Sequence, residues 1–166
     1  MKRIAAAAAA ALLTLTACPR PAARPAESTA QVRADSIVLE RTRCYGTCPA
    51  YRLTLTRAGQ VRFASVWPAD TPPGAGTIAA ADFASLVDEA ARIGFWELPA
   101  RIEGSRLCPT YATDLPSVYL TIHAGARTKR VDDYLGCMGT PELRALEVRI
   151  DSVAGSRRWI RVPELR

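Results

Sequence analysis

Five cysteines carry most of the chemistry that this chain of 166 residues could perform. A thiol can carry a lipid, form a disulfide, bind a soft metal ion or exchange electrons, and the neighbouring sequence favours one of these over the others. Cys18 lies alone at the end of an apolar segment, whereas three residues separate Cys44 from Cys48. Cys108 and Cys137 follow much later in the chain. The lone cysteine and the other four therefore need separate explanations.

The first seventeen residues predict a signal peptide, 1–17, that is removed from the mature protein. Lys2 and Arg3 provide a positive start. The apolar run that follows, 4–15, is shorter than the roughly 20 residues of a membrane span. It ends in Leu-Thr-Ala-Cys at 15–18, which resembles the lipobox of bacterial lipoproteins. That resemblance implies cleavage before Cys18 and attachment of a diacylglycerol to its thiol.

Residues 18–35 predict the lipidated cysteine followed by a disordered stalk. Pro, Ala and scattered charges dominate 19–35 without apolar periodicity, so this segment cannot bury a core. In lipoproteins the residue after the acylated cysteine influences sorting, and Asp there favours the inner membrane, whereas this chain has Pro19. The resemblance therefore implies a cell-envelope protein held to a membrane by its lipid anchor, in the outer membrane facing the periplasm if the cell has two membranes.

Residues 36–166 predict a single globular domain. They contain 17 Lys or Arg and 14 Asp or Glu, a net charge of +3, against +6 for the whole chain. Charges of both signs are interspersed, and no basic helix face or aromatic-interleaved basic stripe occurs, so a nucleic-acid partner is not expected. The remaining four cysteines are an even number in an exported domain, which indicates two disulfides. Four cysteines allow three connectivities, and the residues alone leave all three open.

A metal or redox role for Cys44 and Cys48 is the main alternative. Copper chaperones of thioredoxin type also use Cys-x-x-x-Cys-Pro with a later histidine, and this chain has one, His123. In that fold the motif opens a helix, whereas here it leads into an alternating strand, and His123 falls on the polar phase of its own strand. The separations of 3, 59 and 28 residues do not fit paired zinc knuckles. We therefore expect no metal site and no cofactor.

Three carboxylates beside expected sheet ends are candidates for acid–base chemistry: Asp114, Asp132 and Asp133. Solvated turns or salt bridges to nearby basic residues explain them more simply, the expected partners being Arg127, Lys129 and Arg130. The sequence contains no Gly-x-Ser-x-Gly elbow and no Gly-rich phosphate loop after a strand. We therefore expect no catalytic residue and no enzymatic activity. The three tryptophans are expected in the core or at its rim: Trp67, Trp96 and Trp159.

Alternating apolar residues predict five strands. The expected ranges are 37–41, a hairpin of 51–56 and 61–65, and a second hairpin of 118–123 and 128–134. The segments 67–76 and 100–116 are expected to be loops. Helical spacing predicts one helix over 83–93, before Gly94, and another from Pro141 to Gly155 with Thr140 as its N-cap. This order predicts an α+β fold: an antiparallel sheet of two hairpins plus an extra strand, with two helices packed on one face.

Residues 44–51 read Cys-Tyr-Gly-Thr-Cys-Pro-Ala-Tyr. They resemble a bacterial family of domains of unknown function built around Cys-Tyr/Phe-Gly-Thr-Cys-Pro-x-Tyr. Weaker matches extend the resemblance over 36–160: Gly59, Phe95-Trp96, Thr113-Asp114, Val131 with Tyr134, and Ile150 to Ile160. The resemblance implies exported or lipid-anchored proteins with no established activity. In that family the first two cysteines belong to the signature and the later two are optional, which favours the pairs Cys44–Cys48 and Cys108–Cys137.

These features lead us to expect a membrane-tethered envelope lipoprotein. Its domain is expected to be a non-enzymatic binding or structural module stabilised by disulfides, with an envelope protein or a small ligand as partner. The alternative is a thiol redox or copper-handling protein that uses Cys44 and Cys48.

Overall fold

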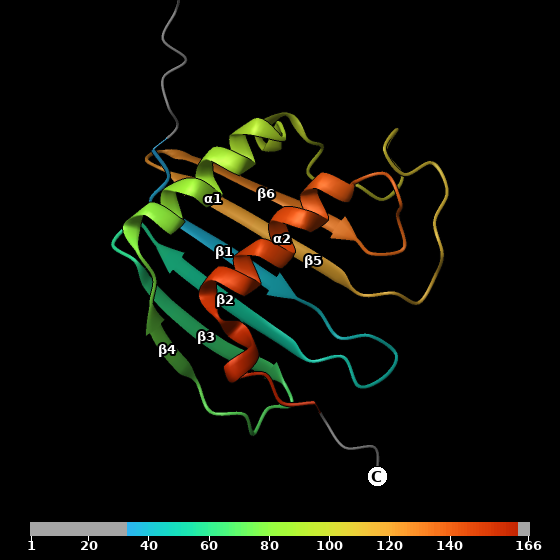
Figure 1. Ribbon diagram of the computed structural model, residues 1–166. Helices are drawn as coiled ribbons and strands as arrows, with labels where there is room; N and C mark the ends of the chain where they lie inside the picture. Colours follow the sequence, from blue (N-terminus) through green and yellow to red (C-terminus); the bar gives the residue numbers. More distant parts are fainter. Residues whose placement is uncertain (1–32, 163–166) are drawn as a thin grey trace, which may run out of the picture. The chain divides into compact units, whose positions relative to one another are not determined.

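Six strands form one antiparallel sheet in the computed structural model, which describes residues 33–162 (Figure 1). They are β1 (Ser36–Arg41), β2 (Ala50–Thr56), β3 (Gln60–Trp67), β4 (Gly74–Thr77), β5 (Ser117–Ala124) and β6 (Arg127–Tyr134). Their order across the sheet is β4-β3-β2-β1-β5-β6, so β1 joins the hairpin β2–β3 to the hairpin β5–β6. The predicted signal peptide, Cys18 and most of the predicted stalk lie outside the described residues.

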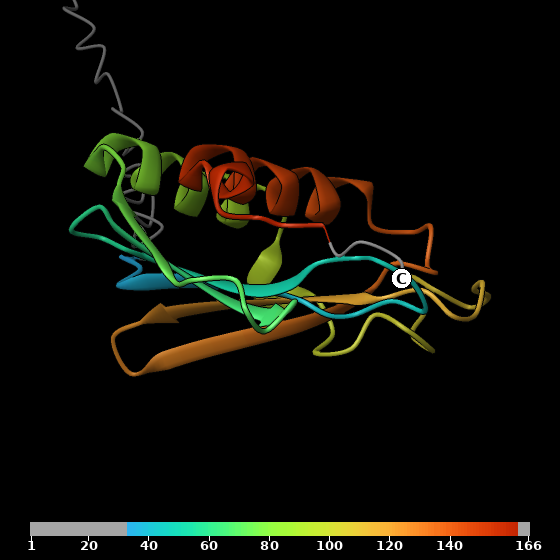
Figure 2. The same ribbon diagram turned by 90° about the horizontal axis from the view of Figure 1, so that it is seen from below.

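Two helices, α1 (Ala80–Arg92) and α2 (Pro141–Ala154), cover the same face of the sheet (Figure 2). Each is followed by one short turn of 3₁₀ helix: η1 (Phe95–Glu97) and η2 (Ser156–Arg158). The predicted α+β fold with both helices on one face is therefore confirmed. Within 33–162, no helix has the length and apolar character needed to span a membrane.

The sixth strand corrects the prediction of five strands. The segment 67–76 was expected to be loop, but β4 begins at Gly74 and pairs with β3. A Cβ atom at Gly74 would lie 2.5 Å from the ring of Trp159, and one at Gly76 would lie 2.3 Å from Nη2 of Arg158. The absence of side chains at these two positions lets the C-terminal segment pack onto the strand. A contact of this kind, between segments far apart in the chain, leaves no local sequence pattern.

Both helices begin and end close to the predicted positions. Helix α1 ends at Arg92, and Gly94 follows in the left-handed region with φ of 70°. Helix α2 has Pro141 in its first turn and Gly155 at its C-terminal end with φ of 61°. Thr140 is the N-cap residue of α2, but its hydroxyl makes no capping hydrogen bond and instead contacts Asp133.

The core between the helices and the sheet is apolar along most of its length. One row of residues across four strands is fully buried: Leu53, Leu39, Leu120 and Val131. Burying an aliphatic side chain of this size contributes about 1.5–3 kcal/mol. The row at the end of the sheet where β1 and β6 finish is different: Tyr51, Arg41, Val118 and Asp133. Three of these four side chains are polar, and they face the same helices.

Candidate functional site

Asp151 of α2 joins three elements at this end of the sheet. Its Oδ2 accepts a hydrogen bond from Nε of Arg41 on β1 at 2.7 Å, and Nη2 of Arg41 lies at the same distance. Its Oδ1 accepts hydrogen bonds from the hydroxyl of Tyr51 on β2 at 2.8 Å and from Ser156 of η2 at 2.7 Å. A hydrogen bond to a charged group contributes more than a neutral one. The carboxylate therefore holds α2, two strands and the start of the C-terminal segment in one arrangement.

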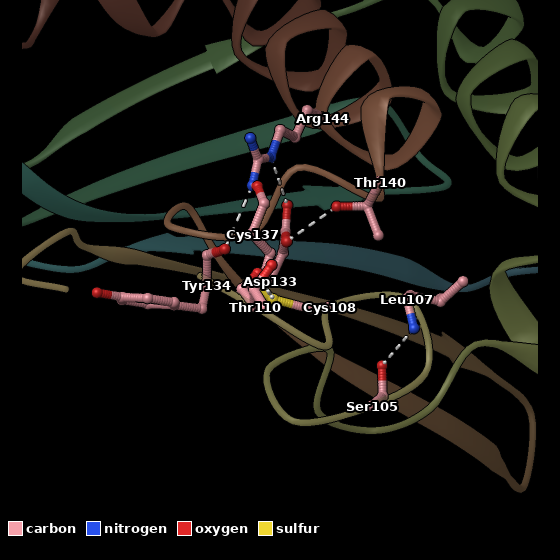
Figure 3. The surroundings of a disulfide bond; sticks show 9 residues. All are labelled: Ser105, Leu107, Cys108, Thr110, Asp133, Tyr134, Cys137, Thr140 and Arg144. Carbon is pink, nitrogen blue, oxygen red and sulfur yellow. Dashed lines mark hydrogen bonds and ion pairs between the residues drawn. A yellow bond between two sulfur atoms is a disulfide. The ribbon is translucent and has the colours of Figure 1, made fainter. Parts of the chain in front are cut away.

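A second ion pair lies on the β6 side of the same row (Figure 3). Asp133 is completely buried and accepts hydrogen bonds from Arg144 at 3.2 Å and from the hydroxyl of Thr140 at 3.1 Å. Arg144 also donates to the backbone carbonyls of Tyr134 and Cys137. The arginine thereby links α2 to the loop after β6, which contains one end of a disulfide.

Glu147 is the one member of this network without a complementary partner in the described part of the chain. It comes between Arg144 and Asp151 along α2, is 1% exposed, and its Oε1 has no hydrogen-bond partner there. Burial and the charge of Asp133 raise the pKa of Glu147 to about 8. The network contains two arginines and three carboxyl groups: Arg41, Arg144, Asp133, Asp151 and Glu147. A proton on Glu147 makes the total charge of these five side chains zero.

Three other groups in this network also have raised pKa values: Arg41, Tyr51 and Asp133. Burial alone would lower the pKa of Arg41, but the carboxylate of Asp151 and nearby groups raise it overall, so the guanidinium stays charged. Burial and Asp151 raise the pKa of Tyr51, so its phenol keeps the proton that it donates. Burial also raises the pKa of Asp133, against the opposing effect of Arg144. This arrangement suits a structural junction, because Arg41 and Tyr51 are both bound to the carboxylate of Asp151.

Both disulfides lie at the same end of the sheet as the polar row. The structure joins Cys44 to Cys48 and Cys108 to Cys137, the pairing that the family resemblance favours. On the chain-entropy model, loops of these lengths, with separations of 4 and 29 residues, give about 2 and 3.5 kcal/mol of stability. Cys108 and Cys137 are 1% and 0% exposed, whereas Cys44 and Cys48 are half-buried.

Close packing of two loops surrounds the buried disulfide. A Cβ atom at Gly136 would lie 2.2 Å from the carbonyl oxygen of Ala112, and one at Gly139 would lie 1.9 Å from that of Leu107. The loop that follows β6 can therefore approach the segment around Cys108 only because these two positions lack side chains.

A pocket of about 220 Å³ opens between the polar row and the small disulfide loop. Three of its lining residues belong to the row itself: Tyr51, Arg41 and Val118. The remaining walls come from five separate segments and are mostly apolar: Thr42, Cys48, Pro49, Pro116, Ser117, Leu135 and Ile160. Thr42 and Ser117 close the end of the sheet, because the amide of Ser117 donates to the Thr42 hydroxyl at 2.8 Å. The pocket is our candidate functional site.

The structure does not bring the predicted copper ligands together. His123 pairs with Ser36 at the start of β1, while Cys44 and Cys48 follow the end of that strand. The imidazole Nδ1 lies 3.0 Å from the hydroxyl of Thr128. Within residues 33–162, no three His, Cys, Asp or Glu side chains form a group that could hold a metal ion.

The salt-bridge partners expected for Asp132 and Asp133 were wrong, whereas Asp114 lies in an exposed bend, as a solvated turn would place it. Asp133 pairs with Arg144 and Thr140, and Asp132 pairs with Arg101 at 4.0 Å. Asp114 is exposed and has φ of 63°. Alternation along β6 points Asp133 toward α2 and Asp132 away from it, so neighbours in sequence have different partners.

Each tryptophan lies beside an arginine. Arg43, Arg127 and Arg158 stand 4.0–4.2 Å from the ring centres of Trp67, Trp96 and Trp159 respectively. Trp96 and Trp159 pack against the core, as expected for rim aromatics.

A family model described as a domain of unknown function, DUF6438, matches residues 35–154. The chain belongs to this family. No curated protein matches the chain with significance. The match contains the whole sheet and α2, so Arg41, Tyr51 and Asp151 all lie inside the DUF6438 domain, while Ile160 of the pocket lies beyond it. Residues just before β1 also pack against the domain, because Ala34 is buried and the amide of Asp35 donates to the carbonyl of His123.

Sequence reasoning did not identify the network around Asp151 in this DUF6438 domain. One signal was present: Glu147 falls at a helical spacing that continues the apolar stripe of Leu143, Leu146 and Ile150. A carboxylate on the buried face of a helix needs a partner or a proton. The identity of the partners depends on where α2 crosses the sheet, which the sequence does not show.

We predict that E147Q makes stability less dependent on pH. The pKa of Glu147 is about 8 in the native state and near 4.5 in the unfolded state. The contribution of its protonated carboxyl group to the free energy of unfolding is therefore fully present below pH 4.5 and is lost as the pH rises toward 8. The free energy of unfolding of E147Q, measured in urea relative to that of the wild type, should therefore rise by about 3 kcal/mol between pH 5 and pH 8. The exposed Glu142 on the same helix provides the control, and E142Q should follow the wild-type profile. Parallel profiles for E147Q and the wild type would contradict the prediction.

Proposed function

We propose that this protein is a lipid-anchored lipoprotein of the cell envelope whose DUF6438 domain is a non-enzymatic binding module. The lipobox-like end of the N-terminal segment supports the anchor at Cys18. The observation that carries the binding role is the pocket, whose apolar walls come from separate segments held by cross-links and by Asp151. If the cell has two membranes, the domain faces the periplasm from the outer membrane.

The polar side chains around the pocket support binding over catalysis. Arg41 and Tyr51 both donate to Asp151, which accepts from a third donor, Ser156, as well. A general base needs a lone pair that is free to take a proton from substrate. Groups that satisfy one another instead keep the walls of a site rigid, which lowers the entropic cost of binding.

Thiol redox chemistry at Cys44 and Cys48 is a second candidate, favoured by one observation. This pair is half-buried and Cys48 lines the pocket, whereas the other disulfide is inaccessible. An accessible disulfide can react with an external dithiol, which forms a mixed disulfide and then leaves two protein thiols and an oxidised reagent. A copper site that uses His123 gains no support, because the histidine lies at the other end of β5.

The anchor predicts a lipid-dependent location. Two or more acyl chains on Cys18 are enough for stable membrane association, at about 0.8 kcal/mol for each buried methylene. Expressed in a bacterium, the wild-type chain should fractionate with membranes and incorporate labelled palmitate, and Cys18→Ser should do neither. Substitution of a cysteine inside the domain should not affect labelling, so C44S/C48S is the matched control. Label that persists in Cys18→Ser would refute the anchor.

The binding module predicts that both disulfides are inert. In a glutathione buffer poised near −230 mV, structural disulfides remain oxidised, because their potentials typically lie below about −300 mV. Alkylation of free thiols followed by mass mapping of the oxidised chain should therefore detect neither Cys44 nor Cys48. The buried pair, Cys108 and Cys137, serves as the internal reference. Selective opening of Cys44–Cys48 under these conditions would instead establish the redox candidate.

A further inference from the structure

The pocket has a charge pattern as well as an apolar lining. Among residues 33–162, Arg41 is the charged residue that lines the pocket, and no acidic side chain of that range does so. Its bonds to Asp151 use Nε and Nη2, so in the described part of the chain Nη1 is not engaged by this carboxylate. An arginine presents five N–H donors, more than one carboxylate can accept.

Two further arginines adjoin the pocket through their chain neighbours. Arg43 follows the lining residue Thr42, and Arg161 follows the lining residue Ile160. Both are exposed, and within residues 33–162 neither forms a salt bridge, whereas many other arginines of the domain do. Arg41 thus lines the pocket, whereas Arg43 and Arg161 each follow a lining residue in the chain, and the guanidinium of Arg43 lies over the ring of Trp67.

The size of the pocket limits the ligand. Sites for drug-sized molecules typically measure about 300–1,000 Å³, and this pocket measures about 220 Å³. Its apolar lining favours hydrocarbon, because Pro49, Val118 and Ile160 offer no hydrogen-bonding side chains. A short acyl chain or a single ring is of suitable size.

We infer that the pocket binds a small amphipathic carboxylate, with its hydrocarbon part against the apolar walls and its anionic group toward Arg41, Arg43 and Arg161. The inference rests on the proposed binding function and adds the chemical class of the ligand. Exposed cations contribute modestly, so selectivity for the anion should be several-fold and should weaken at high salt.

The test uses octanoate and two probes of equal chain length, octanol and octylammonium. The full chain carrying Cys18→Ser is exported to an oxidising compartment, so that the disulfides form and no acyl group of its own competes. Titration is followed by amide NMR shifts. Octanoate should shift amides of Cys48, Ser117, Val118, Leu135 and Ile160, and should bind about three- to tenfold more tightly than octanol. Octylammonium should bind more weakly than either.

The variant R43Q/R161Q should lose the preference for octanoate and keep its affinity for octanol. The matched control is R62Q/R127Q, in which two exposed arginines away from the pocket are changed, one of them stacked on a tryptophan as Arg43 is. Filling the pocket with Ser117→Met should weaken octanoate and octanol alike.

Equal binding of octanoate and octanol, or tighter binding of octylammonium, would overturn the inference while leaving an apolar binding module in place. Failure of all three probes to shift the pocket amides would also overturn it. The proposed function is judged separately, by the oxidation state of Cys44 and Cys48 and by lipid labelling at Cys18.

Discussion

The carboxylate of Asp151 is the point on which the organisation of the pocket depends. It binds Arg41 at the end of β1, Tyr51 at the start of β2 and Ser156 at the start of η2. Those three elements lead directly to pocket walls: Arg41 to Thr42, Tyr51 to Pro49 and Ser156 to Ile160. Because removing one partner from a buried ion pair leaves an uncompensated charge, this junction is costly to break. The position of α2 on the sheet and the shape of the pocket therefore depend on the same side chain.

The two disulfides complement this junction on either side. Cys44–Cys48 closes the loop between β1 and β2, and Cys108–Cys137 attaches the loop after β6 to the long segment before β5. Leu135, two residues before Cys137, lies in the pocket wall, and Arg144 binds the carbonyl of Cys137 from α2. The end of the sheet with the longest loops thus carries the two disulfides and the partly buried ion pairs of Asp151 with Arg41 and of Asp133 with Arg144. The opposite end, with the turn at Gly59 and the short turn at Gly125, needs neither, because tight turns already connect its strands.

Most of the fold could be predicted because its determinants are local. Alternation marked β2, β5 and β6, and Pro141 with Gly155 marked α2. The strand β4 could not be predicted, because Gly74 is explained by Trp159, 85 positions later in the chain. The aspartates of β6 were identified as notable, but their partners were not, since Arg144 reaches Asp133 only through the crossing of α2 over the sheet. The network around Asp151 was not predicted for the same reason, because it depends on contacts between distant segments of the chain.

A double-mutant cycle between Arg41 and Asp151 measures whether this ion pair holds α2 to the sheet. The free energy of unfolding is measured in urea for the wild type, R41Q, D151N and the double variant, at one pH and with both disulfides oxidised. We predict a coupling energy of about 1–3 kcal/mol, because each single substitution leaves the other partner half-buried without its counter-charge. Additivity within about 0.5 kcal/mol would show instead that this pair does not hold the helix and the sheet together.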